Sequence, residues 1–385
     1  MINLSVALFV LSLLAIFRAP AKPLWFAAIG VTEWGHYMGL VSILLALISW
    51  RVTRRWGMSP WFCLASAVLY FSPLARASLL AQDLPSQFSA SFGTPMLSEN
   101  PSAPFRVSPL NLKELFLGVR SPAIRLSHEA YATIEGQTLS LDLYQPAQRG
   151  TLLPGVIVIH SGSWQSGERG EFPNLNLYLA ARGYIVASID YRMAPGAVFP
   201  AQRNDVYSAI AYLKNHADSI GLDKNRLILL GRSAGGQIAL SAAYEAKDPA
   251  IKGVIAFYAP NDLVWGYSRP GNPLIMNSQK VIETYLGGKP ADVPGRYETA
   301  SPLHFVDKHT PPTLMIHGVR DELVWAQHDE RLSKRLTEEG RPYFYLRLPW
   351  ATHGCDANFS GPCGQLSTYT IERFLAAVTQ KESHG

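Results

Sequence analysis

The sequence lacks any block of lysine and arginine residues, although its formal net charge is +5. Because the basic residues are scattered, the sequence shows no electrostatic footprint for nucleic acid. It also has no internal repeat and no low-complexity tract. These absences predict a chain whose charge serves solubility, with no nucleic-acid partner and no obligate protein partner.

Cysteine is also scarce, with three in 385 residues. Cys63 lies in an apolar run, whereas Cys355 and Cys363 lie close together in a loop-like stretch. These two could form a disulfide or remain free thiols, and a disulfide would indicate an oxidising compartment. The pair therefore favours a location outside the cytoplasm for the C-terminal domain but leaves the bridge open.

Long apolar runs, in contrast, are abundant at the N-terminal end, over residues 2–17, 24–50 and 61–81. Because about 20 apolar residues span a bilayer core, each run is a plausible span. No Lys or Arg precedes the first run, and two more runs follow it, which argues against a cleaved signal peptide. We expect residues 1–81 to form a multi-pass membrane region of about three helices.

Two ionisable residues, Glu33 and His36, interrupt the second apolar run on one helical face. An ionisable pair inside a membrane is by default a functional hypothesis. Alternatively, Trp34 and Tyr37 mark an interfacial belt in which both groups are wet, and this is the interpretation that we favour.

The rest of the chain divides into a linker and a domain of alternating strands and helices. Proline and serine are frequent over residues 82–121, which predicts a linker with one short helix at 111–116. Residues 122–385 follow an α/β pattern that predicts a mostly parallel sheet with helices on both faces. Strands are expected at 130–134, 139–144, 156–160, 185–190, 227–230, 254–258, 313–317 and 343–348.

The candidate nucleophile is Ser233, in Gly231-Arg232-Ser233-Ala234-Gly235, between a predicted strand and a predicted helix. A G-x-S-x-G motif at a strand-to-helix turn is typical of a nucleophile elbow. The turn strains the serine backbone, and a Cβ at either flanking glycine would collide across the bend. Ligands of parallel sheets bind beyond the carboxyl ends of the strands, where Ser233 lies.

A serine nucleophile needs a base, and the base needs an acid that orients it. Among ten histidines, His353 follows the last predicted strand directly and is the candidate base. Asp321 follows the preceding strand and preserves the chain order Ser, Asp, His, so it is the candidate acid. The rival acids are Glu322, Asp329 and Asp356. His160 and His317 lie at the ends of predicted strands, and we expect them to form hydrogen bonds with backbone groups.

Backbone amides are the expected stabilisers of a developing oxyanion. The candidate donors are Ala234, which follows the nucleophile, and Gly162 and Ser163, in the loop after the strand at 156–160. An insertion at about 261–310 is expected to form part of a lid or acyl pocket. The candidate substrate contacts are Trp164, Tyr191 and Trp265.

Residues 130–377 resemble the α/β-hydrolases, and within them the carboxylesterase branch near hormone-sensitive lipase and the bacterial feruloyl-esterase-like lipases. The resemblance rests on residues 160–164, 190–195, 231–236 and 352–354 and on the turn around Asp321. Two departures are Ser161 and Ser163, where the family often has glycine, and Arg232, where relatives often have Asp, Glu or His. Residues 190–192 resemble a structural link of the family and receive no catalytic role.

The resemblance implies an α/β-hydrolase fold and ester hydrolysis without a metal or organic cofactor. We therefore expect a membrane-anchored serine hydrolase that cleaves a small-molecule or lipid ester through an acyl-enzyme. An amidase or peptidase with the same triad, an acyltransferase, and a non-catalytic membrane binding protein of the same fold remain the alternatives.

Overall fold

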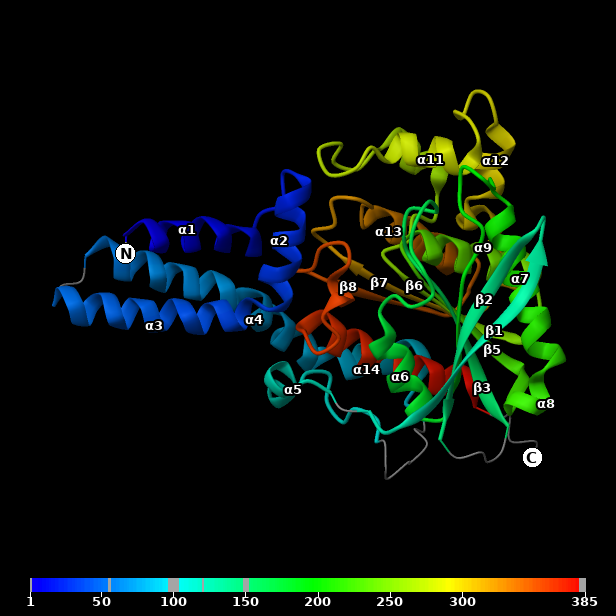
Figure 1. Ribbon diagram of the computed structural model, residues 1–385, viewed down its shortest axis with the longest axis horizontal. Helices are drawn as coiled ribbons and strands as arrows, with labels where there is room; N and C mark the ends of the chain where they lie inside the picture. Colours follow the sequence, from blue (N-terminus) through cyan, green and yellow to red (C-terminus); the bar gives the residue numbers. More distant parts are fainter. Residues whose placement is uncertain (1, 55–56, 96–103, 120, 148–151, 381–385) are drawn as a thin grey trace.

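In the computed structural model, which describes residues 2–54, 57–95, 104–119, 121–147 and 152–380, eight strands form one sheet (Figure 1). Continuous runs of β-branched and leucine residues make the inner strands, which are buried on both faces. The strands are β1 (Ile124–Ile134), β2 (Gln137–Pro146), β3 (Leu153–Ile159), β4 (Ile185–Ile189), β5 (Leu222–Arg232), β6 (Ile251–Phe257), β7 (Thr313–Gly318) and β8 (Tyr343–Leu348).

The strand order is β1-β2-β4-β3-β5-β6-β7-β8. β1 pairs with β2 and β2 with β4 in antiparallel register, while the remaining neighbours are parallel. The predicted mostly parallel sheet is therefore confirmed. Because parallel strands end at the same edge, the loops after β3, β5, β7 and β8 meet there and can share one site.

Helices cover both faces of the sheet and create two hydrophobic cores. One core includes side chains of α7 (Ala201–Asn215), α9 (Ala234–Ala246) and α13 (Gln327–Glu338). The other includes α6 (Pro173–Ala181), α14 (Pro362–Thr379) and the second half of α4 (Met58–Phe92). The short helices α5 (Leu112–Leu117) and α8 (Ala217–Ile220) and the 3-10 turn η3 (Cys355–Ala357) complete this domain.

The N-terminal region consists of α1 (Ile2–Ser12), η1 (Leu13–Ala15), α2 (Lys22–Glu33), α3 (Gly35–Thr53) and the first half of α4. Figure 1 shows α1, α3 and α4 extending side by side away from the sheet, with α2 lying across their inner end. The second apolar run is thus not one helix, because the chain turns at Trp34 between α2 and α3. By length and composition α3 and α4 could cross a membrane, whereas residues 2–15 form a shorter apolar helical segment.

The boundary expected at residue 81 differs from the structure, because α4 continues as a helix to Phe92. Leu84 and Phe88, four residues apart on one helical face, are buried in the second core of the sheet domain. Proline is tolerated here, with Pro73 and Pro85 inside the helix. The short helix expected at 111–116 is α5, and residues 96–103 and 120 of the predicted linker lie outside the described residues.

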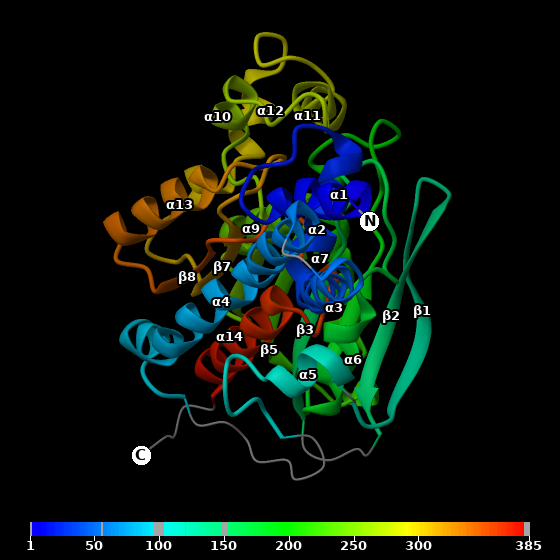
Figure 2. The same ribbon diagram turned by 90° about the vertical axis from the view of Figure 1, so that its left-hand side faces the viewer.

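The insertion after β6 contains α10 (Leu263–Ser268), α11 (Ser278–Leu286), α12 (Pro294–Thr299) and the 3-10 turn η2 (Pro302–Phe305). Figures 1 and 2 place α10, α11 and α12 together at one end of the sheet domain. The site described next lies between this insertion and the carboxyl edge of the sheet.

Candidate active site

Ser233 lies at the sharp turn between β5 and α9, with φ of +52°. This is the left-handed region, which non-glycine residues avoid unless the surroundings enforce it. A Cβ on Gly231 would come within 2.1 Å of the Gly235 carbonyl oxygen, and one on Gly235 within 2.3 Å of the Ile159 carbonyl oxygen. Both glycines are therefore required by the close approach of backbone segments.

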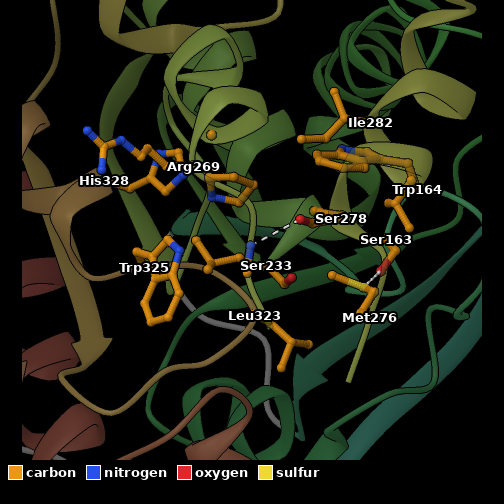
Figure 3. Close-up of a pocket in the computed structure, with 16 residues that line it drawn as sticks. Ser163, Trp164, Ser233, Arg269, Met276, Ser278, Ile282, Leu323, Trp325 and His328 are labelled. Atoms are coloured by element: carbon orange, nitrogen blue, oxygen red, sulfur yellow. Dashed lines mark hydrogen bonds between the residues drawn. The ribbon is translucent and has the colours of Figure 1, made fainter. Parts of the chain in front are cut away.

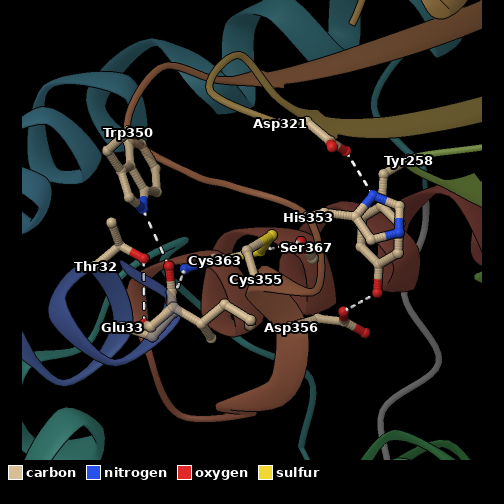
Figure 4. The surroundings of a disulfide bond; sticks show 12 residues. Thr32, Glu33, Tyr258, Asp321, Trp350, His353, Cys355, Asp356, Cys363 and Ser367 are labelled. Atoms are coloured by element: carbon tan, nitrogen blue, oxygen red, sulfur yellow. Dashed lines mark hydrogen bonds and ion pairs between the residues drawn. A yellow bond between two sulfur atoms is a disulfide. The ribbon is translucent and has the colours of Figure 1, made fainter. Parts of the chain in front are cut away.

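His353, in the loop after β8, joins Ser233 to Asp321. Its Nε2 lies 3.0 Å from Ser233 Oγ, and its Nδ1 lies 2.6 Å from Asp321 Oδ2. Figure 4 shows His353 with its ring directed at Asp321. The structure thus brings together the three side chains that the sequence analysis selected from distant parts of the chain.

Asp356, one rival acid, has other partners. Its Oδ2 lies 2.5 Å from Arg232 Nε and its Oδ1 accepts a hydrogen bond of 2.5 Å from Tyr258 Oη. The ring of Tyr258 in turn packs against His353, with centroids 4.4 Å apart. Arg232, the unusual residue of the elbow, is therefore the ion-pair partner of Asp356, which also binds the Tyr258 that packs against His353.

The rival Glu322 also has other partners. Its carboxylate accepts hydrogen bonds from the Ala19 amide, at 2.7 Å, and from the Thr352 hydroxyl. An N-terminal residue therefore binds directly beside Asp321, which the sequence did not predict.

The third rival, Asp329, binds His317 at the end of β7. His317 Nδ1 lies 2.8 Å from Asp329 Oδ2, while its Nε2 lies 2.9 Å from the Val324 carbonyl oxygen and 3.2 Å from Asp321 Oδ2. The expected backbone contact is present, but the two carboxylate contacts were missed. Their only signal in the sequence was a histidine that closes the strand just before the candidate acid.

The electrostatics of Asp321 follow from these neighbours. Burial alone would raise its pKa, but the charge and hydrogen bonds of His353 and His317 hold the pKa well below its ordinary value. Burial likewise opposes protonation of His317, yet Asp329 and Asp321 raise its pKa well above the ordinary value. Asp321 is therefore an anion held between two imidazoles.

The loop after β3 adopts an unusual conformation beside Ser233. Gly162, Ser163 and Trp164 all have positive φ, of 110°, 56° and 59°. A Cβ on Gly162 would lie 1.8 Å from the Ser166 carbonyl oxygen, so only glycine fits there. Among the described residues, the amides of Ser163 and Ala234 donate no hydrogen bond, and both residues line the pocket around Ser233.

A pocket opens at Ser233, and its walls come from the loop after β3, the insertion and the turn after Asp321 (Figure 3). Most of its wall is apolar. The labelled lining residues are Ser163, Trp164, Ser233, Arg269, Met276, Ser278, Ile282, Leu323, Trp325 and His328. His328 was not among the predicted residues, because no motif in the sequence surrounds it.

Of the three candidate substrate contacts, only Trp164 lines this pocket. Tyr191 is 1% exposed and stacks beneath His160, where its hydroxyl donates to the Ser161 carbonyl oxygen at 3.2 Å. Trp265 packs edge-on against the outer side of His328. The structure therefore places Tyr191 and Trp265 outside the lining of this pocket, since the sequence does not show in which direction an aromatic side chain of a loop points.

Comparison with known proteins agrees with this geometry. A model of the BD-FAE family matches residues 141–336, about half of the chain. The chain belongs to the BD-FAE family of α/β-hydrolases. The resemblance to the carboxylesterase and lipase branch is thereby confirmed, and the match contains Ser233 and Asp321 but ends before His353.

Several curated relatives of this BD-FAE chain are named esterases. Esterase LipC of Mycobacterium tuberculosis is 31% identical over 240 residues, which are 58% of this chain and 58% of LipC. The probable carboxylic ester hydrolase LipM of the same organism is 27% identical over 246 residues, 60% of this chain and 56% of LipM. The chain spans little more than half the length of these relatives.

Solved structures share the fold of this family member at low sequence identity. A bacterial heroin esterase superposes with a TM-score of 0.59 at 22% identity, covering 67% of this chain and 85% of that chain. At this identity the likeness shows the α/β-hydrolase fold alone.

Proposed function

We propose that this protein is a membrane-anchored serine hydrolase that cleaves carboxylic esters through a Ser233–His353–Asp321 triad. The observation that carries the proposal is the pair of contacts at His353, 3.0 Å to Ser233 Oγ and 2.6 Å to Asp321 Oδ2. A base within hydrogen-bond reach of a nucleophile, itself oriented by a third group, is the arrangement that activates serine.

In this mechanism His353 Nε2 takes the proton of the Ser233 hydroxyl while Ser233 Oγ attacks the ester carbonyl carbon. The C–O bond to the alcohol portion then breaks, and His353 returns the proton to the leaving alcohol. Water, deprotonated by His353 in the same way, hydrolyses the acyl-enzyme and restores Ser233. Asp321 stays ionised throughout, holds the imidazole and stabilises the imidazolium that forms.

The oxyanion is stabilised by the amides of Ala234 and Ser163, with Gly162 as the remaining candidate. Free amides that line the pocket beside the nucleophile support this role. Each such donor contributes about 3 kcal/mol to transition-state stabilisation. Ser233 and Ala234 also lie at the N-terminus of α9, where the helix dipole favours negative charge.

Membrane anchoring is supported by the surface of the N-terminal helices. Large apolar side chains are exposed all along α3 and the first half of α4, where water would be a poor solvent for them. They include Leu40, Leu44, Leu47, Trp61 and Val68. The disulfide between Cys355 and Cys363 supports a catalytic domain outside the cytoplasm, because such bonds persist in oxidising compartments.

The test is hydrolysis of p-nitrophenyl esters by the detergent-solubilised full chain, compared with Ser233→Ala and with the surface variant Ser219→Ala. We expect Ser233→Ala to lose ~10³-fold or more in kcat/KM. Ser219→Ala should match the wild type, because that serine lies on the exposed helix α8. Equal rates for wild type and Ser233→Ala would refute the triad, and faster cleavage of matched p-nitroanilides would favour the amidase alternative.

A further inference from the structure

The N-terminal region does more than hold the catalytic domain near a membrane, because it contacts the turn that carries Asp321. The Ala19 amide donates to Glu322 Oε1 at 2.7 Å, and Arg18 Nη2 donates to the Val319 carbonyl oxygen at 2.9 Å. In the opposite direction, Arg320 Nη2 donates to the Leu14 carbonyl oxygen at 2.8 Å. Bonds in both directions fix this segment against the catalytic turn.

Helix α2 contacts the loop that carries His353. The buried carboxylate of Glu33 accepts hydrogen bonds from the Cys363 amide, at 2.9 Å, and from the Trp350 indole, at 3.3 Å (Figure 4). Glu33 is therefore buried against the loop of His353 and not solvated, which contradicts the favoured sequence interpretation of this residue. About two turns earlier on α2, the ring of Trp25 lies 6.5 Å from the ring of His353.

The insertion makes the third contact with this segment. The Asn272 side chain donates to the carbonyl oxygens of Ala19 and Pro20, and the Lys22 amide donates to the Leu274 carbonyl oxygen. Ile275 is buried in one cluster with residues of η1, α2 and α4. The start of α2 and the tip of the insertion are thus joined at the mouth of the site.

An apolar surface surrounds this junction. Leu274 is 71% exposed and Phe26 is 57% exposed, and Phe17 and Leu24 are also exposed. We call these four residues the apolar rim. Exposed apolar side chains are also found on α1 and α3, and α2 lies across the inner end of those helices (Figure 1).

From the apolar rim an apolar wall leads to the nucleophile. Leu323 lines the pocket at Ser233 and also packs against the cluster that contains Ile275 and Trp25. Met276, the neighbour of Ile275, lines the pocket as well. An acyl chain that enters past the apolar rim would therefore meet apolar side chains along its path to Ser233.

Basic side chains accompany the apolar rim. Arg18 and Lys22 are exposed, and the Arg18 guanidinium lies 5.0 Å from the ring of the pocket residue Trp325. Arg269, also exposed, lines the pocket. Cations beside exposed aromatic and aliphatic groups suit the headgroup level of a lipid surface, where phosphates and acyl chains meet.

We propose that the site of Ser233 opens onto the membrane surface and takes amphiphilic esters directly from the bilayer, past the apolar rim. This inference rests on the proposed esterase function and adds the substrate class: esters whose apolar portion is dissolved in lipid. It also makes residues 13–33 one wall of the active-site mouth.

The experiment uses the full chain reconstituted into phosphatidylcholine vesicles. Two substrates are compared, p-nitrophenyl palmitate dissolved in the vesicles and water-soluble p-nitrophenyl acetate. The measured quantity is the ratio of kcat/KM for the vesicle ester to kcat/KM for the soluble ester. The rim variants are Phe26→Glu and Leu274→Glu, with Leu274→Met as the conservative variant and Leu126→Glu, on exposed β1 surface, as the matched charge control.

Introducing a charge at the apolar rim should lower this ratio about tenfold or more, because the rim no longer enters the lipid surface. Leu274→Met and Leu126→Glu should keep the wild-type ratio. An unchanged ratio in both rim variants, or a wild type that cleaves only the soluble ester, would overturn membrane access while leaving the esterase function intact. A wild type that cleaves neither ester would reject the proposed function itself.

Discussion

Two buried carboxyl groups, Asp321 in the turn after β7 and Glu33 at the end of α2, have pKa values that are shifted in opposite directions. Both are 0% exposed. The pKa of Asp321 is held well below its ordinary value, whereas burial raises the pKa of Glu33 to about 8. Burial acts in the same direction on both, so the difference comes from their partners.

The partners of Asp321 are two imidazoles and two backbone amides. Its Oδ2 lies near His353 and His317, while its Oδ1 accepts from the amides of Leu323 and Val324 at 2.8 and 2.9 Å. Glu33 receives only neutral donors, the Cys363 amide and the Trp350 indole. At Asp321 the charge and hydrogen bonds of the imidazoles outweigh desolvation, whereas at Glu33 the two neutral donors do not.

The sharpest test of this comparison makes the same change at both positions. Asp321→Asn should lower kcat by about 10⁴-fold, because an amide cannot hold His353 in the required tautomer or stabilise its cation. Glu33→Gln, an equally buried acid-to-amide change, should leave kcat within a few-fold of the wild type. Steady-state hydrolysis of p-nitrophenyl acetate measures kcat for both variants. Equal losses of kcat would contradict the expectation that only Asp321 acts on His353.

A second test removes the cation that keeps Asp321 ionised. His317→Gln should lower kcat by about 10²-fold with little change in KM, because Asp321 loses a charged neighbour and its fixed position. The double variant His317→Gln/Asp329→Asn leaves no unpaired carboxylate, so it should fold while retaining the defect. His216→Gln, on the exposed end of α7, is the control. Wild-type kcat in the double variant would show that His317 does not position Asp321.

The smallest effect concerns the pH dependence of stability at Glu33. The pKa of Glu33 is about 8 in the folded chain and about 4.5 in the unfolded chain. At pH values between these two, Glu33 is protonated in the folded chain and ionised in the unfolded chain. The contribution of Glu33 to stability is therefore present below about pH 4.5 and is lost as pH rises through about 8. The loss should amount to a few kcal/mol, reduced by relaxation of the site.

Glu33→Gln should remove this pH dependence and raise Tm above the wild type at pH 9. Glu298→Gln, on the exposed surface of α12, should follow the wild-type curve. Thermal unfolding in detergent from pH 5 to pH 9 measures the difference, and parallel curves for wild type and Glu33→Gln would contradict the raised pKa.

Much of the sheet could be predicted from the sequence, because continuous runs of β-branched residues are typical of buried parallel strands. Strands expected at 254–258 and 343–348 are β6 and β8, with ends that differ by at most a few residues. The turn at Ser233 could also be predicted, since Gly231 is required by a collision with Gly235, four residues away, although the close contact of Gly235 with Ile159 appears only in the tertiary structure. Chain order favoured Asp321 over Asp356, which follows His353, but only distances show that each rival carboxylate has other partners.

The environment of the N-terminal helices was harder to predict from the sequence. An apolar helix looks the same in sequence whether lipid or a protein core covers it, so the passage of α4 from exposed Val68 to buried Phe88 had no sequence signal. For the same reason Glu33 was read as a membrane or surface residue, although it packs against the loop of His353. Tyr191 and Trp265 were misplaced because the direction of a loop side chain depends on the elements around it.

By itself the sequence determined the alternation of strands and helices, the strained serine turn and the chain order of the three candidate catalytic residues. These depend on local sterics and on hydrophobic periodicity, which act over a few residues. Only the tertiary structure decided which carboxyl group meets His353, how the pKa values of the buried carboxyl groups differ, and that residues 13–33 contact the turn of Asp321 and the loop of His353. Those outcomes depend on contacts between segments some 300 residues apart, such as Ala19 with Glu322 and Glu33 with Cys363.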